Sequence, residues 1–150
     1  MPKRILALDI ANTTGYAWTD GDRLLSGVWR FTTKTKQSPG MRFLHFQDVL
    51  AAFHKNTGFD AVYYEQVRRH LGVDAAHVYG GYESHLMAFC DRNQVEYQGI
   101  DVGAIKKHAT GKGNADKAAM VAAAKARGWR VEDDNEADAL WILDLVRNWK

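Results

Sequence analysis

The sequence has one cysteine, no long apolar run and little net charge, and each of these shortages excludes a class of protein. A single cysteine, Cys90, cannot form an internal disulfide, and the apolar residues 86–89 before it predict a buried thiol in a reducing compartment. The apolar run near the amino terminus is short and is broken by Asp9, so it fits neither a signal peptide nor a membrane span. We therefore expect a cytosolic protein that does not enter the membrane.

The overall composition is that of a globular domain. Apolar residues make up 46% of the 150 residues and charged residues 25%, and no low-complexity tail is present. A chain of this length can bury a substantial core but is too short for two ordinary domains, so we expect one domain over residues 1–150. The net charge of +2 is too small to indicate nucleic-acid binding by itself.

The pattern of apolar residues predicts an α/β domain with a mixed central sheet and helices on both faces. The first three strands are expected to form an antiparallel meander, after which helices and strands alternate. Asn114 and Asp134 are expected to cap the last two helices. Extended segments are predicted at residues 4–10, 16–19, 24–33, 59–67, 95–98 and 129–132, and helices at residues 41–55, 74–93, 105–109, 115–127 and 134–148.

The predicted helix over residues 74–93 contains two adjacent glycines, Gly80 and Gly81. Glycine inside a helix costs about 1 kcal/mol relative to alanine. The pair therefore predicts the close approach of another element or of a second subunit.

Three carboxylates, Asp9, Glu65 and Asp138, each interrupt an otherwise apolar run. Burying an ionised carboxylate costs several kcal/mol, so each must be protonated, paired or bound to a metal ion. The three can meet only if the strands of Asp9 and Glu65 are neighbours and the last helix packs across their ends. The alternative is that they serve separately as helix caps and in salt bridges.

Oxygen ligands without a cluster of histidine and cysteine favour Mg²⁺ or Mn²⁺ over zinc. Two such ions about 3.5–4 Å apart can bind the attacking and leaving oxygens of a phosphodiester. If the three acids converge, hydrolysis of a nucleic acid is the favoured chemistry. Basic residues in two clusters could then hold phosphates, with solvated side chains as the alternative: Arg68, Arg69 and His70 in one, and Lys106, Lys107, His108, Lys112 and Lys117 in the other.

Short motifs along nearly the whole chain resemble, in their order, the RuvC-type Holliday junction resolvases. They are ILALD at 5–9, TGYA at 14–17, YEQV at 64–67, GNADK at 113–117 and EADAL at 136–140. The chain looks like a divergent, phage-like member. The resemblance implies a ribonuclease-H-like fold, a homodimer, and Mg²⁺-dependent nicking of two opposed strands of a four-way DNA junction that leaves 5′-phosphate and 3′-hydroxyl ends.

By this resemblance Asp9, Glu65 and Asp138 are metal-binding catalytic carboxylates that hold two Mg²⁺ or Mn²⁺ ions. The family has a further Asp or His three positions before the last acid, where this chain has Asn135. Either Asn135 is a weaker ligand, as the alignment favours, or the adjacent Asp134 reaches the metal instead; the alternative role for Asp134 is the helix cap.

The resemblance also implies roles for the basic residues. Lys106 and Lys117 would contact the DNA backbone near the scissile phosphate, and Lys112 belongs to the same cluster. Arg68 and Arg69 occupy the loop that probes the junction centre in the family, but this chain has no obvious aromatic wedge there.

Two other functions stay open. A nuclease of the same fold could act on forked DNA or on RNA–DNA hybrids. Alternatively, the chain is a non-catalytic module that binds nucleic acid or phosphate, because residues 9–15 also resemble the phosphate loop of sugar-kinase-like ATPases; the chain is, however, too short for the two lobes of those proteins.

Overall fold

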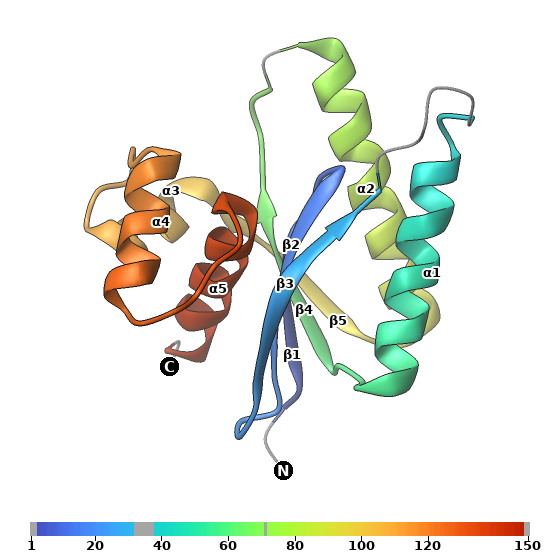
Figure 1. The fold of residues 1–150 in the computed structure, drawn as a ribbon. Helices are drawn as coiled ribbons and strands as arrows, with labels where there is room; N and C mark the ends of the chain where they lie inside the picture. Colours follow the sequence, from blue (N-terminus) through green and yellow to red (C-terminus); the bar gives the residue numbers. More distant parts are fainter. Residues whose placement is uncertain (1–2, 32–37, 71, 149–150) are drawn as a thin grey trace.

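A five-stranded mixed sheet separates two layers of helices (Figure 1). The computed structural model describes residues 3–31, 38–70 and 72–148. Helices α1 and α2 cover one face of the sheet, and α3, α4 and α5 cover the other. In chain order the elements are β1 (Ile5–Asp9), β2 (Thr13–Thr19), β3 (Leu24–Arg30), α1 (Met41–Asn56), β4 (Ala61–Gln66), α2 (Val73–Arg92), β5 (Glu96–Asp101), α3 (Val102–Thr110), α4 (Lys117–Ala126) and α5 (Asp134–Arg147).

The strand order is β3-β2-β1-β4-β5, which makes β1 and β4 neighbours. The first three strands pair antiparallel, as the sequence predicted, whereas β1, β4 and β5 run parallel. The register pairs Leu8 with Tyr64, so that the next residues, Asp9 and Glu65, lie side by side at the carboxyl ends of the two strands. The first condition for convergence of the acids is therefore met.

Alternation along the strands builds a separate core on each face of the sheet. Leu6 and Leu8 point toward α1 and α2, whereas Ala7 between them points toward α5. The free thiol of Cys90 is fully buried in the first core, as predicted. Among the described residues, no helix has the length and the apolar character needed to span a bilayer.

The turn after β1 is shorter than the sequence predicted. Residues 13–15 were expected in a turn, but they extend β2, because they pair with residues 28–30 of β3. The expected extended segment at residues 129–132 is not a strand. Part of the segment predicted to extend β3 to residue 33 lies outside the described residues.

Both predicted helix caps were wrong by one or two residues. The carboxylate of Asp116, not Asn114, accepts a hydrogen bond from the Ala119 amide at 2.8 Å and caps α4. Asp133, not Asp134, caps α5 by accepting from the Glu136 amide at 2.9 Å. An aspartate just before a helix can cap it from either of two adjacent positions, and tertiary packing selects one. The side chain of Asp134 therefore does not cap α5.

The glycine pair in α2 divides into two different environments. A Cβ on Gly81 would lie 2.5 Å from the ring of Phe43 on α1, so this glycine permits close packing of another element. A Cβ on Gly80 would meet nothing within 4 Å. The predicted close approach of another element is therefore confirmed for Gly81. The predicted contact with a second subunit stays a prediction.

Candidate metal centre at the carboxyl ends of the strands

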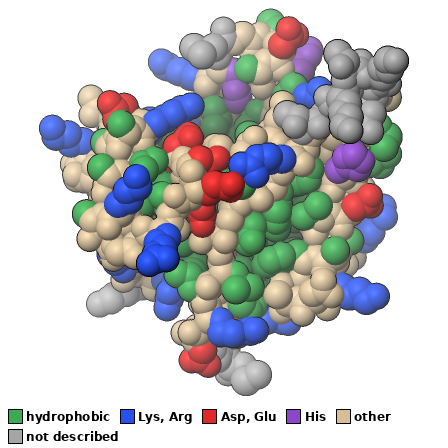
Figure 2. Space-filling model, in the orientation of Figure 1, with side chains coloured by type: hydrophobic (Ala, Val, Ile, Leu, Met, Phe, Trp, Pro, Cys, Tyr) green, Lys and Arg blue, Asp and Glu red, His purple; other side chains and the backbone are tan. Residues whose placement is uncertain are grey.

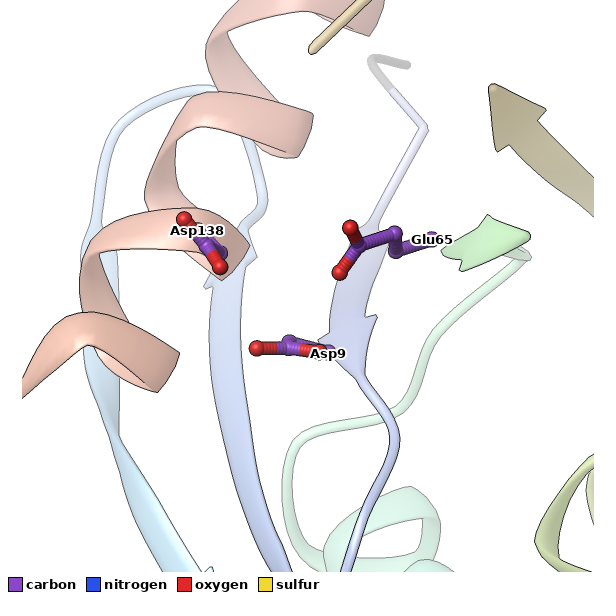
Figure 3. Close-up of side chains that lie close together, drawn as sticks. All are labelled: Asp9, Glu65 and Asp138. Atoms are coloured by element: carbon purple, nitrogen blue, oxygen red, sulfur yellow. The ribbon is translucent and has the colours of Figure 1, made fainter. Parts of the chain in front are cut away.

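Three carboxylates from distant parts of the sequence converge at one point (Figure 3). Asp9 ends β1, Glu65 lies near the end of β4, and Asp138 lies just past the first turn of α5. One oxygen of each carboxylate lies within 4.8 Å of one oxygen of each of the others. The predicted convergence is confirmed, and such a group can hold a metal ion.

Gly15 explains how α5 comes so close to the sheet. It is buried in β2 and pairs with Asp9 in β1. A Cβ at this position would overlap the backbone carbonyl of Asn135, in the first turn of α5. Because a side chain here would force the helix outward, the missing Cβ sets the distance between Asp138 on the helix and Asp9 on the strand. The sequence motif contains Gly15, but its contact partner could not be identified from the sequence.

A fourth acid, Glu136, anchors the start of α5 and is not part of the cluster. Its side chain is buried and accepts hydrogen bonds from the Ser26 hydroxyl on β3 and the Glu132 amide, both at 2.6 Å. Sequence reasoning missed this role, because Ser26 lies 110 positions away and carries no local signal.

The electrostatics of the cluster favour protonation when no cation is bound. Burial raises the pKa of Asp9 well above its ordinary value, and the charges of Glu65 and Asp138 raise it further. Burial also raises the pKa of Glu65, although a hydrogen bond with Asp9 and the charge of Lys106 act in the opposite direction. The pKa of Asp138 is raised to about 7, mainly by burial and then by the charge of Glu65.

One buried oxygen of the cluster lacks any partner. Among the described residues, Oδ1 of Asp138 is the one buried side-chain oxygen or nitrogen without a hydrogen bond. A buried acceptor left unsatisfied costs roughly 1–3 kcal/mol, and a bound cation would remove that cost. The donor set consists of hard carboxylate oxygens, which Mg²⁺ and Mn²⁺ prefer. The residues present therefore fit a divalent cation.

The carboxylates open into a pocket with a volume of about 260 Å³. Both candidates for a further ligand, Asp134 and Asn135, line it. Asp134 also pairs with Lys117 at 3.8 Å, and the Asn135 amide donates to Asp133 at 3.3 Å. Figure 2 shows acidic side chains gathered near the start of α5 with Lys and Arg side chains on either side. The remaining lining residues are Lys106 and Met120.

The predicted basic residues differ in their relation to this pocket. Lys106 and Lys117 line it, whereas Lys112, Arg68 and Arg69 are exposed and lie outside its lining. His108 was expected to belong to a phosphate-binding cluster with Lys106, but its Nε2 lies 2.8 Å from a carboxylate oxygen of Asp144. Residues two positions apart on a helix point in different directions, so His108 faces Asp144 and does not line the pocket with Lys106.

An apolar groove that the sequence did not predict continues from Asp9, with a volume of 470 Å³. It runs between the turn after β1 and the first half of α2, and its walls include His70 and Tyr79 with ring centroids 5.0 Å apart. The Tyr79 hydroxyl donates to the Glu65 carbonyl at 2.8 Å, which holds the ring in place. Tyr79 lies three and seven positions before the buried residues Tyr82 and Leu86, a helical spacing that by itself indicates core packing. The acidic pocket thus adjoins an apolar groove, and Asp9 lines both.

The raised pKa values predict that the metal-free protein loses stability as the pH rises. The folded state keeps the Asp138 proton up to a pKa of about 7, while the unfolded chain releases it near 3.8. The folded state therefore binds more protons between these values, and its free energy of unfolding falls by on the order of a few kcal/mol from pH 4 to pH 7. Urea denaturation in a chelator across this range measures the fall. Saturating Mg²⁺ should reverse it, and a flat profile would contradict the prediction.

No protein-family model and no curated protein sequence matches the chain. Solved structures do match it. Thermus thermophilus RuvC in complex with a Holliday junction substrate aligns with a TM-score of 0.77 and 17% identity, over 93% of this chain and 90% of that one. A further structure of T. thermophilus RuvC aligns with a TM-score of 0.66 and 18% identity, again over 93% of this chain and 90% of that one. The yeast mitochondrial Holliday junction resolvase aligns with a TM-score of 0.63 and 16% identity, over 94% of this chain and 76% of that one. This chain therefore has the ribonuclease-H-like fold of the RuvC-type Holliday junction resolvases.

Proposed function

We propose that this chain is a Mg²⁺- or Mn²⁺-dependent endodeoxyribonuclease that resolves four-way DNA junctions by paired nicks. The convergence of Asp9, Glu65 and Asp138, with one oxygen of Asp138 unsatisfied, carries this proposal. It is supported by the likeness of the fold to a RuvC that was solved with a Holliday junction substrate.

The three carboxylates would hold the ions, and Asn135 or Asp134 would supply a further ligand. When bound, a pair of ions activates water and stabilises the attacking and leaving oxygens of a phosphodiester. The protein's own contribution is a partly buried, preorganised set of carboxylates, which lies at the meeting point of two strands and a helix and therefore needs little rearrangement.

The basic residues would hold the DNA. Lys106 and Lys117 border the acids, and their charges lower the pKa of Asp138 against the stronger effect of burial. They would offset the repulsion between the acidic pocket and a phosphate. Lys112, Arg68 and Arg69 would contact more distant phosphates and contribute affinity without sequence information.

The apolar groove beside Asp9 would take an unstacked base next to the cleaved phosphate. His70 and Tyr79 offer ring faces for stacking, which compensates for the lack of an aromatic side chain at Arg68 and Arg69. A homodimer would present two such sites with the two-fold symmetry of a four-way junction.

Parallel cleavage of four-way, forked and RNA–DNA substrates in Mg²⁺ and in Mn²⁺ tests the proposal. We expect the four-way junction to be cut at least about tenfold faster, which corresponds to about 1.4 kcal/mol of transition-state discrimination. Opposed strands should be nicked together, and light scattering should give two chains per junction. Preferred cutting of forks or hybrids would indicate the related nuclease, and binding without metal-dependent cutting would indicate a non-catalytic module.

A further inference from the structure

A second charged cluster lies outside the acidic pocket and is centred on Asp144 of α5. The side chain is 11% exposed and has two polar partners from other parts of the chain, a histidine and an arginine. His108 lies 2.8 Å from Oδ2, and Arg127 donates to both oxygens, at 2.9 and 3.3 Å. Burial by itself raises the pKa of Asp144, but the hydrogen bonds from His108 and Arg127 hold it below its ordinary value. Asp144 is therefore a firmly held anion.

Aromatic side chains fix both partners of this anion. The Arg127 guanidinium lies over the Trp129 ring at 5.0 Å, and Trp129 contacts Trp141 at 4.7 Å in an edge arrangement. The His108 ring contacts Trp141 at 5.8 Å. The Trp141 indole donates to the Met120 carbonyl on α4 at 3.3 Å, so that the same tryptophan links α5 to α4 directly. The cluster thus has both ionic and apolar contacts that resist displacement.

The two partners of Asp144 belong to the helices that carry the lysines of the acidic pocket. His108 lies on α3, two residues after Lys106. Arg127 is the C-cap of α4, whose first residue is Lys117. Lys117 itself is 87% exposed and pairs with Asp134 only at 3.8 Å, a surface contact that contributes little. The positions of both lysines therefore depend on how α3 and α4 are held against α5.

We propose that Asp144 is the positioning residue that holds Lys106 and Lys117 beside the acidic cluster. It lies six residues after Asp138, about 9 Å farther along the same helix. By binding His108 it fixes α3, and by binding Arg127 it fixes the end of α4. One carboxylate on the helix of Asp138 thus ties both lysine-bearing helices to it. The effect on cleavage rests on the proposed nuclease function, whereas the effect on lysine position does not.

The first test is a comparison of Asp144→Asn in two backgrounds. In the otherwise unchanged protein it should slow junction cleavage about tenfold, mainly by raising KM, because the lysines no longer lie in register with the phosphates. In the Lys106→Met/Lys117→Met background the same change should cost less than about twofold, since the side chains through which it acts are absent. An equal loss in both backgrounds would overturn the proposal. Arg127→Lys provides a second variant at a half-exposed residue. It keeps the positive charge and loses the bidentate hydrogen bonding to Asp144.

The second test needs no catalytic activity. Lysines labelled with ¹³C-methyl groups are observed by NMR in metal-free protein, and the signals of Lys106 and Lys117 are assigned from their Met variants. Both signals should shift in Asp144→Asn. They should stay unchanged in Asp60→Asn, a matched control whose carboxylate also pairs with an arginine, Arg4, but at the opposite end of β4 from Glu65. Unmoved lysine signals in Asp144→Asn would overturn the proposal even if the protein cleaved no DNA.

Discussion

Asp138→Asn is expected to abolish junction cleavage while leaving junction binding nearly intact. The change removes one negative charge and one oxygen ligand from the cluster with almost no change in shape. Loss of a preorganised charged group at a reacting centre costs roughly 10²–10³ in rate, and loss of a metal ligand adds to it, so we expect a decrease of at least about 10³-fold. Binding should change by less than about threefold, since it comes chiefly from the lysines and arginines. Single-turnover cleavage and titration of labelled junction measure the two effects.

The stability of Asp138→Asn separates a local loss from unfolding. A neutral amide avoids the burial cost that raises the Asp138 pKa to about 7. The metal-free variant should therefore be at least as stable as the unchanged protein at pH 8, and its stability should vary less between pH 4 and pH 7. Full cleavage activity in this variant would remove Asp138 from the site.

Two neighbouring variants decide which residue is the further ligand. Asp134→Asn and Asn135→Ala each remove one of the candidates that line the pocket. The variant that weakens Mn²⁺ binding identifies the ligand. Asp134 has the stronger charge, whereas Asn135 is favoured by the resemblance.

Gly15→Ala is expected to displace α5 and to destabilise the protein strongly. The new Cβ would overlap the carbonyl of Asn135, which is backbone in the first turn of a packed helix and cannot rotate away. Overpacking of this kind typically costs about 1–3 kcal/mol, and this contact should lie at the upper end or beyond it. Because the helix must move outward, Asp138 should also separate from Asp9 and Glu65. Urea denaturation and Mn²⁺ titration measure the two effects.

Gly80→Ala provides the matched control for Gly15→Ala. Both changes add a single methyl group, but a Cβ on Gly80 meets nothing within 4 Å. Because Gly80 lies inside α2, alanine should stabilise the helix by about 0.5–1 kcal/mol. Equal stability of the two variants would mean that the close approach at Gly15 does not hold α5 in place.

Much of the fold could be predicted from local patterns. Alternation along β1 places Leu6 and Leu8 on one face of the strand and Ala7 on the other, and the two cores are arranged in that way. Element boundaries were less accurate where pairing decided them. Residues 13–15 have the composition of a turn, but they are strand because they pair with β3, and Gly15 pairs with β1 as well.

The roles of the aspartates in the helical layer could not be assigned from composition. Asp133 and Asp134 are adjacent acids before the same helix, and which of them caps it depends on how α5 docks. Asp144 lies in the same apolar run as Asp138 but faces His108 and Arg127 rather than the acidic pocket. Position within an apolar helix indicates that an acid needs a partner and does not identify the partner.

The sequence by itself determined that Asp9, Glu65 and Asp138 would be withdrawn from water, because each lies within an apolar run and burial follows such local patterns. The tertiary structure alone decided that they meet. It pairs β1 with β4, and it brings α5 onto the sheet at Gly15. These arrangements depend on which surfaces of distant segments fit together, and a single chain carries no local signal for that.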